Sequence, residues 1–401
     1  MVAKFQWVRR FTALTVVAAA VCVALSATDG SALPRMTLMA GSRCSNCHVN
    51  PQGSGIRTEF GFYSMAQNGA TTWDKLGWQK FHDLSDNRVM DGRITLGMDL
   101  RGQMAKFRVP RWVEVEGQQV QVDPERNVFP MQQNFGASVQ ISETLSAAAS
   151  LNIAHLFKNY KGQSLFDGWL RFAPDLELPS IRVGMLQPSL GIRHDDHTIL
   201  LRRNPFQPAQ PLLAPNWNEL GAEISYEGMH WLSVEVGAFT AKNLSLSCAD
   251  SVKSDDLIAS GRLTLWPQSL DYGINSWIGG SFLKAGEMTV IGGHVGLGKT
   301  YWGTLIGEFT MSKTVKQREI MSMLVHAAYP IYDWLVAEAR YEVSNGSKLV
   351  SAKTEEMQMT SWVAGLQFMP LSNIELRPEY RMLKTKDWMI GQWALQLHVW
   401  F

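Results

Sequence analysis

The sequence predicts an all-β fold: an outer-membrane β-barrel of about 16 strands that holds a small N-terminal unit as a plug. From Gly92 onward, apolar and polar residues alternate with a period of two in one segment after another. Such alternation places one face of a strand in hydrocarbon and the other in water. The segments are also about 10–15 residues long and even in number, which favours a membrane barrel over a sandwich of strands of ~5–6 residues.

We expect the barrel to occupy residues 91–401. Its predicted strands, separated by turn signals, are residues 92–107, 131–141, 143–157, 165–173, 180–190, 217–228, 229–241, 256–267, 270–284, 286–299, 300–313, 318–329, 330–344, 357–369, 371–385 and 387–401. The last strand has apolar residues at every second position from Trp393 to the terminal Phe401. That pattern is typical of the C-terminal assembly signal of bacterial outer-membrane barrels, so we expect the protein in that membrane.

Two further features agree with a barrel. Tryptophans gather near the ends of predicted strands, where interfacial girdles are expected: Trp231, Trp266, Trp302, Trp334, Trp362 and Trp388. Charged residues occupy alternate positions of one late strand and are expected to line its lumen face: Glu375, Arg377, Glu379 and Arg381.

The first 32 residues read as a secretory signal peptide. Lys4, Arg9 and Arg10 form a basic start, residues 11–27 are apolar, and small residues precede the expected cleavage site. This pattern indicates export, with a retained N-terminal anchor as the alternative.

The net charge argues against a nucleic-acid partner, and the cysteine content argues against a disulfide framework. The formal net charge is +1 and the pI is about 7.7, whereas a nucleic-acid-binding chain would carry a strongly basic patch. Beyond residue 32, three cysteines remain, two of them in one motif and the third at Cys248. We therefore expect no disulfide framework.

The N-terminal unit, residues 33–90, is built around the sequence Cys-Ser-Asn-Cys-His at residues 44–48. This is C-x-x-C-H, the attachment signature of a c-type haem, in which Cys44 and Cys47 bond the haem and His48 is the proximal iron ligand. The alternatives are a redox pair, a disulfide or half of a zinc site. No βαβ pattern and no second ligand pair accompany the motif, so we predict one covalent haem c.

The residues around the motif also suit a flat cofactor. The stretch 51–55 is rich in Gly and Pro, which lets backbone approach closely. Arg43 and Arg57 could neutralise the haem propionates, or they could be ordinary surface charges.

The sixth ligand of the haem iron has several candidates. A Met ligand raises the potential relative to His, and the sequence supplies both residue types. Met65 and His82 are the nearest candidates downstream, and Met36 or Met39 could fold back from upstream. An open site is the remaining alternative.

The longest interruption of the strand pattern is the Pro-rich segment 190–216, which we expect to be an external loop or an inward-folded one. At its start, residues 194–197 read His-Asp-Asp-His, and His194 and His197 could hold a transition metal such as iron. The alternative is a solvated polar turn. Residues 108–130 and 242–255 are lesser loop candidates, and Cys248 in the latter is expected to be an incidental thiol.

Residues 293–300 match the P-loop expression G-x-x-x-x-G-K-[ST]. A P-loop needs a helix after the glycines to bind phosphate. Here the residues on both sides alternate as strands, so we predict strand and turn, and no nucleotide partner.

Taken together, the motif at Cys44, Cys47 and His48, Pro51 after it and the barrel architecture resemble the fused porin–cytochromes. These are outer-membrane monohaem c-type cytochromes whose best-known members oxidise iron. The resemblance covers essentially the whole mature chain. It implies an electron-transfer cytochrome, with Fe(II) oxidation as one candidate activity.

The main functional hypothesis is an outer-membrane electron conduit. Its haem would pass electrons between an extracellular donor or acceptor, Fe(II) being one candidate, and a periplasmic cytochrome or other carrier. A single haem cannot bridge a hydrocarbon core ~30 Å thick, so the haem must lie in the lumen or the donor must enter it. The alternative is a solute porin whose haem unit is a plug or a redox sensor.

Overall fold

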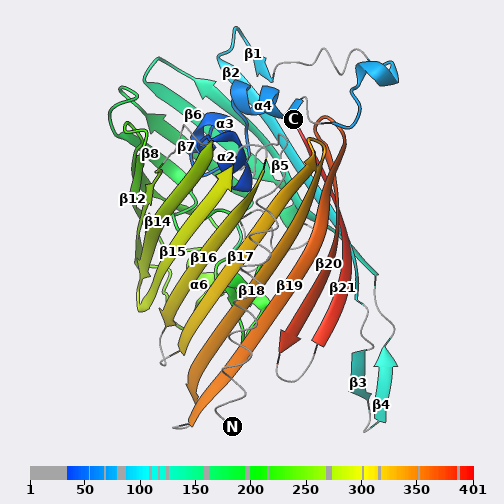
Figure 1. The fold of residues 1–401 in the computed structure, drawn as a ribbon. Coiled ribbons are helices and arrows are strands. Elements are labelled where there is room, and N and C mark those ends of the chain that lie inside the picture. Colours follow the sequence, from blue (N-terminus) through cyan, green and yellow to red (C-terminus); the bar gives the residue numbers. More distant parts are fainter. Residues whose placement is uncertain are drawn as a thin grey trace.

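The structure is a computed structural model. It describes residues 34–401 apart from 54, 67–68, 79–86, 108–110, 116–117, 123–125, 157–161, 195–198, 215, 268–272, 300–301, 315–317, 351–352 and 386–388. Antiparallel strands form a closed barrel, and the N-terminal helices lie in one of its mouths (Figure 1). No helix in the described part of the chain is long and apolar enough to cross a bilayer.

The barrel wall has 16 strands, as predicted. Each one overlaps one of the predicted segments: β2 Ile94–Phe107, β5 Arg126–Gln140, β6 Leu145–Asn152, β7 Phe166–Phe172, β8 Ser180–Leu186, β11 Glu219–Tyr226, β12 Leu232–Thr240, β13 Leu257–Leu265, β14 Ile274–Ala285, β15 Met288–Lys299, β16 Gly303–Thr314, β17 Arg318–Tyr332, β18 Leu335–Val350, β19 Lys353–Leu371, β20 Ile374–Thr385 and β21 Met389–Trp400. Neighbours along the chain pair with each other, and β2 pairs with β21 from Asp99↔Trp400 to Phe107↔Gln392, which closes the barrel.

The remaining described elements are short. In the N-terminal unit they are α2 Pro34–Ala40, α3 Cys44–Cys47, α4 Glu59–Ala66, η1 Asp74–Leu76 and β1 Arg88–Val89, which pairs with β2. Between barrel strands they are β3 Arg111–Val115, β4 Gln118–Val122, η2 Ile153–Leu156, η3 Leu200–Arg202, β9 Arg203–Asn204, β10 Gln207–Pro211 and α6 Leu244–Ser247. The hairpin of β3 and β4 therefore replaces part of the loop predicted at 108–130.

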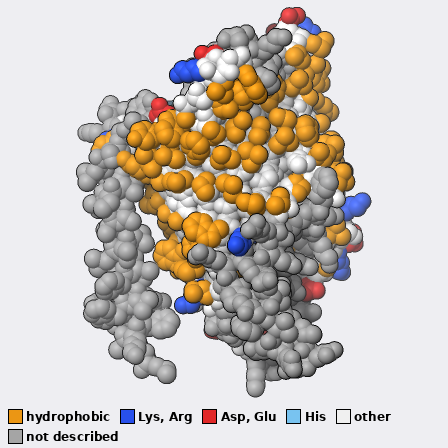
Figure 2. All heavy atoms as spheres, turned by 90° about the vertical axis from the view of Figure 1, so that its right-hand side faces the viewer, with side chains coloured by type: hydrophobic (Ala, Val, Ile, Leu, Met, Phe, Trp, Pro, Cys, Tyr) orange, Lys and Arg blue, Asp and Glu red, His pale blue; other side chains and the backbone are white. Residues whose placement is uncertain are grey.

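The two faces of the wall differ as the alternation predicts. On β11, Leu220 and Ile224 are 56% and 52% exposed, whereas Glu219 and Glu223, each one position before them, are buried. Apolar side chains form a broad band on the outside of the barrel (Figure 2). The charged row on β20 is buried on the lumen side, as expected: Glu375, Arg377, Glu379 and Arg381.

The two ends of the barrel differ in the length of their connections. At the end that carries Phe401, residues 333–334 and 372–373 are among the short links between strands. At the other end, long segments such as 187–218 and 241–256 connect the strands. Outer-membrane barrels have short periplasmic turns and longer extracellular loops, so the end with Phe401 and the N-terminal helices faces the periplasm.

Two sequence-based expectations about single segments have clear outcomes. The P-loop-like residues 293–299 lie in β15, so the prediction of a strand is confirmed. The assignment of Trp266 to an outer girdle is wrong. Its indole Nε1 donates to Ser233 Oγ at 3.2 Å, and its ring lies 5.7 Å from the guanidinium of Arg43 on the lumen side.

Candidate functional site

The C-x-x-C-H motif forms a single helical turn. Cys44 and Cys47 are the first and last residues of α3, and His48 N–H donates to the Cys44 carbonyl at 2.9 Å. His48 itself has extended backbone, with φ −127° and ψ 142°. Both thiols and the imidazole therefore come from five consecutive residues whose backbone is fixed by local hydrogen bonds.

The α4 helix packs directly on this turn. Thr58 links the two, because its N–H donates to the Cys47 carbonyl at 3.1 Å and its hydroxyl to the Asn46 carbonyl at 2.6 Å. One turn later, Gly61 lies so close that a Cβ would overlap the Cys47 carbonyl oxygen. Glycine is therefore required at this position.

The backbone of the Gly-rich stretch borders the motif, in line with the sequence. Gly53 has a φ of +87°, a conformation that suits glycine. A Cβ at Gly53 would lie 3.9 Å from Cys44 Cβ and 4.0 Å from His48 Cδ2. The turn after the motif thus covers the cysteine and the histidine with main chain.

A buried ion pair fastens the N-terminal unit to the barrel wall. Arg35 of α2 donates to both carboxylate oxygens of Glu338 on β18, at 3.1 and 2.8 Å, and also to Gln367 on β19. Beside it, Met36 and Met39 form an apolar cluster with Ala328 and Val336 of the wall. Burial of these apolar side chains adds to the docking energy.

A second contact lies deeper in the lumen. The Gln52 amide donates to Ser189 Oγ at 2.6 Å and to Glu223 at 3.2 Å. Arg182 on β8 donates to Asn50 Oδ1 at 2.8 Å and pairs with Glu223. Gln52, Arg182 and Glu223 are buried, so the tip of the N-terminal unit is held by both the wall and the segment after β8.

The described residues of that segment, 187–194, 199–214 and 216–218, fold into the lumen. The inward-folded loop is therefore the predicted alternative that the structure supports. Side chains of the wall hold it, among them the carboxylates of Glu308 and Glu342. Glu308 on β16 accepts Ile192 N–H at 3.0 Å and lies 2.6 Å from His194 Nε2. Glu342 on β18 accepts Leu200 N–H. The periplasmic unit and this inward loop therefore meet inside the barrel.

His194 therefore contacts a carboxylate of the wall, and its role as a metal ligand stays a prediction. His197 lies outside the described residues. Among the side chains that the structure describes, no group of three His, Cys, Asp or Glu is arranged to hold a metal ion.

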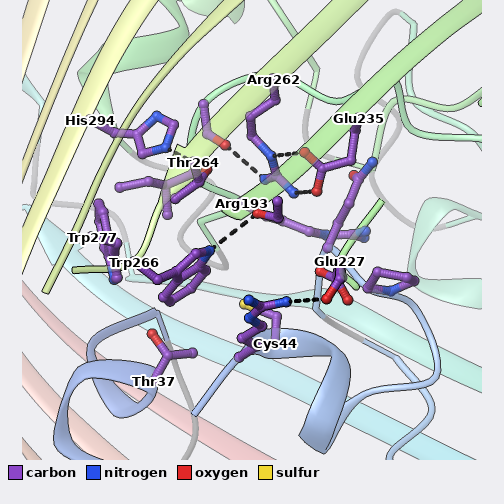
Figure 3. Close-up of a pocket in the computed structure, with 16 residues that line it drawn as sticks. Thr37, Cys44, Arg193, Glu227, Glu235, Arg262, Thr264, Trp266, Trp277 and His294 are labelled. Atoms are coloured by element: carbon purple, nitrogen blue, oxygen red, sulfur yellow. Dashed lines mark hydrogen bonds and ion pairs between the residues drawn. The ribbon is translucent and has the colours of Figure 1, made fainter. Parts of the chain in front are cut away.

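A small cavity of about 60 Å³ lies between the motif and the wall (Figure 3). Space of this size holds roughly four water molecules. It is bordered by Cys44 and by side chains of β12, β13, β14 and β15, among them Glu235, Arg262, Thr264, Trp277 and His294. The guanidinium of Arg262 is fixed by Glu235 at 2.6 and 3.0 Å.

These wall residues were missed by the sequence analysis. Alternation indicates that Glu235, Arg262 and His294 face the lumen, but it does not say which of many lumen residues lie near Cys44. Only the closure of the barrel brings them to the motif.

The two arginines next to the motif have different surroundings. Arg43 donates to the carbonyls of Glu227 and Met229 in the turn after β11, at 2.9 and 2.6 Å. The guanidinium of Arg57 lies 5.1 Å from the ring centre of Trp400 on β21. They contact distant parts of the wall, so a joint role at one pair of propionates stays a prediction.

The candidates for a sixth ligand are placed only in part. Met65 belongs to α4, but its side chain and all of His82 lie outside the described residues. The upstream candidates Met36 and Met39 are packed against the wall and almost fully buried there.

The motif supplies the two thiols and the imidazole that a covalent haem requires. Burial raises the pKa of the Cys44 thiol to about 11. Cys44 and Cys47 share one turn without a disulfide between them, and His48 follows directly. A haem is larger than the cavity of about 60 Å³ beside Cys44, so this cavity alone does not hold it.

The substitution Gly61→Ala is expected to destabilise the N-terminal unit by about 1–3 kcal/mol, because an extra methyl group in a packed contact forces backbone apart. Gly102→Ala is the matched control, since no atom lies within 4 Å of a Cβ there. Limited proteolysis of the folded protein measures the effect. Cleavage within residues 33–90 should accelerate in Gly61→Ala alone, and equal cleavage in both variants would contradict this packing.

Neither a known protein family nor an individual curated protein matches the sequence. Solved structures do match. The loop-deleted OmpT of Vibrio cholerae has a TM-score of 0.53 at 10% identity over 77% of this chain and 99% of its own. The channel DcaP of Acinetobacter baumannii has 0.52 at 11%, over 79% and 99%. OmpF of Salmonella typhi, solved in complex with daunomycin, has 0.51 at 15%, over 78% and 98%.

The chain has the fold of an outer-membrane porin. With its apolar outer band, this fold confirms the predicted location in the bacterial outer membrane.

Proposed function

We propose that this protein is a solute porin whose N-terminal unit carries one c-type haem and closes the periplasmic mouth as a redox-sensitive plug. The observation that carries the proposal is the docking of this unit inside the barrel through Arg35 and Gln52. The porin fold supports the transport part of the proposal. The motif at Cys44, Cys47 and His48 supports the haem.

The residues of the plug have separate tasks. Cys44 and Cys47 would hold the haem by thioether bonds, and His48 would bind its iron. The haem, when bound, supplies a one-electron change of charge. Arg35, Gln52 and Asn50 hold the unit in the mouth together with the apolar cluster of Met36 and Met39. A change of charge at the motif would then act on a unit docked by buried polar and apolar contacts.

An electron conduit is the second candidate, favoured by the same motif and by the resemblance to the fused porin–cytochromes. In that case electrons would pass between an extracellular partner, Fe(II) being one candidate, and a periplasmic carrier. The position of α3 makes electron transfer to an extracellular partner harder. The motif lies at the periplasmic mouth of a core ~30 Å thick, and the inward loop lies between it and the outside.

Side-dependent reduction of the haem distinguishes the two functions. The protein is reconstituted in one orientation, and a membrane-impermeant Fe(II) chelate is added to either side while the haem absorption is followed. A plug at the periplasmic mouth predicts reduction at least tenfold faster from the periplasmic side. Equally fast reduction from the extracellular side would support the conduit and overturn the plug.

A further inference from the structure

The chain leaves the lumen by crossing the periplasmic rim of the barrel at one defined place. Ala70 N–H donates to the Met369 carbonyl at 2.9 Å, and Thr71 N–H to the Pro370 carbonyl at 3.2 Å. Thr71 also forms a parallel bridge with Leu371, the last residue of β19. Residues 70–71 are therefore fixed by backbone bonds to the end of a barrel strand, next to the turn 372–373.

Directly after this crossing, the chain folds into a compact aromatic turn. The rings of Trp73 and Trp78 are stacked, with centres 5.6 Å apart and planes 12° from parallel. Trp78 N–H donates to the Trp73 carbonyl at 2.9 Å, and Gly77, with a φ of +76°, closes η1 between them. Leu76 and Trp78 are nevertheless 50% and 54% exposed. Local bonds thus fix an apolar surface that faces outward.

Aromatic side chains also lie at this part of the rim, as they do at the membrane boundary of a barrel. The carbonyl of Trp334 accepts Met369 N–H at 2.8 Å, one residue before the chain crossing. The Trp334 ring stacks on Tyr332 at 4.9 Å and is half-buried against Met369 and Trp400, whereas Tyr332 is 54% exposed. An exposed Tyr at a strand end marks the interfacial girdle of a barrel. The aromatic turn therefore leaves the lumen beside this girdle.

Figure 1 agrees with this placement, because the short blue coil of η1 lies to the upper right of the mouth, beyond the ring of strands. Lys75 and Asp74 are exposed on the same turn as Leu76. A surface with stacked Trp, an exposed Leu and a Lys fits the headgroup region of a phospholipid leaflet, where indoles and ammonium groups are both favoured.

We propose that residues 73–78 are an interfacial anchor that inserts Leu76 and Trp78 into the headgroups of the periplasmic leaflet. The anchor ties the N-terminal unit to the membrane outside the barrel as well as to the wall inside it. A unit that leaves the lumen would then remain tethered at the rim. This inference does not depend on the haem.

Spin-label accessibility tests the anchor. The variants Leu76→Cys and Met90→Cys are made in a Cys248→Ser background, labelled, and reconstituted in phospholipid nanodiscs. Met90 is the control, because it is 69% exposed in the turn between β1 and β2 at the same end of the barrel. The unsubstituted background, labelled in the same way, corrects for the motif cysteines.

The anchor predicts that the ratio of oxygen to nickel-chelate accessibility is at least threefold higher at position 76 than at position 90. Equal ratios would place the turn in water and overturn the proposal. A low ratio at position 76 that rises only when a second protein is added would assign the surface to a protein partner, and would overturn it as well.

Discussion

Liposomes that contain the double variant Arg35→Ala, Gln52→Ala are expected to swell at least tenfold faster in a small sugar than liposomes with the unchanged protein. Both side chains hold the N-terminal unit in the mouth, and each lost hydrogen bond to a charged group costs about 1.5–3 kcal/mol. Glu338 keeps a partner in the variant, because Arg377 binds it at 2.8 Å. The barrel wall should therefore remain folded while the plug is released.

The matched control is Arg88→Ala in the same N-terminal unit. Arg88 pairs with Glu59 at 2.6 Å, but the two side chains are 30% and 47% exposed. Exposed pairs of this kind contribute about 0–1 kcal/mol, so swelling should stay within twofold of the unchanged protein. Unchanged swelling of a correctly folded double variant would show that these contacts do not close the pore.

In that double variant, the additional substitution Glu308→Ala is expected to raise the single-channel conductance at least twofold in planar bilayers. Glu308 binds both Ile192 N–H and His194, so its loss removes one of the side chains that anchor the inward loop on the wall. The Gly191 backbone also lies against its carboxylate, where a Cβ would overlap Oε1. A released loop widens the path through the lumen.

Glu319→Ala on the neighbouring strand is the control for this measurement. Glu319 pairs with Lys313 at 3.2 Å at the exposed end of the same hairpin, where the side chains are 58% and 67% exposed. Its loss should leave the conductance unchanged. If Glu308→Ala also leaves it unchanged, the loop does not set the width of the pore.

The wall of the barrel was predictable from the sequence because the period-two pattern records membrane on one side and lumen on the other. The ends of strands were less predictable. β8 was expected to reach residue 190 but ends at Leu186, since Gln187 and Ser189 turn inward to bind Gln52. Trp266 misled for a different reason. It lies two residues after Thr264, which faces the lumen, so its lumen direction obeys the strand alternation, and its position near a strand end alone suggested a girdle.

The motif at residues 44–48 was predictable because its chemistry is local, and the structure places it on one turn. The docking contacts were not predictable. Arg35 and Glu338 are separated by 303 positions in the chain, and no periodicity relates them. Glu338 is one of many buried lumen carboxylates, so only the closed barrel selects it as the partner of Arg35.

Covalent haem is tested most directly by a haem stain after denaturing electrophoresis of the protein made in cells that attach c-type haem. The band of the unchanged protein and that of Cys248→Ala should stain, because Cys248 is buried near α6 with its thiol 3.1 Å from the Leu212 carbonyl. The band of Cys44→Ala should lose the stain. An unstained band of the unchanged protein, or a stain that survives Cys44→Ala, would contradict a haem held by this motif.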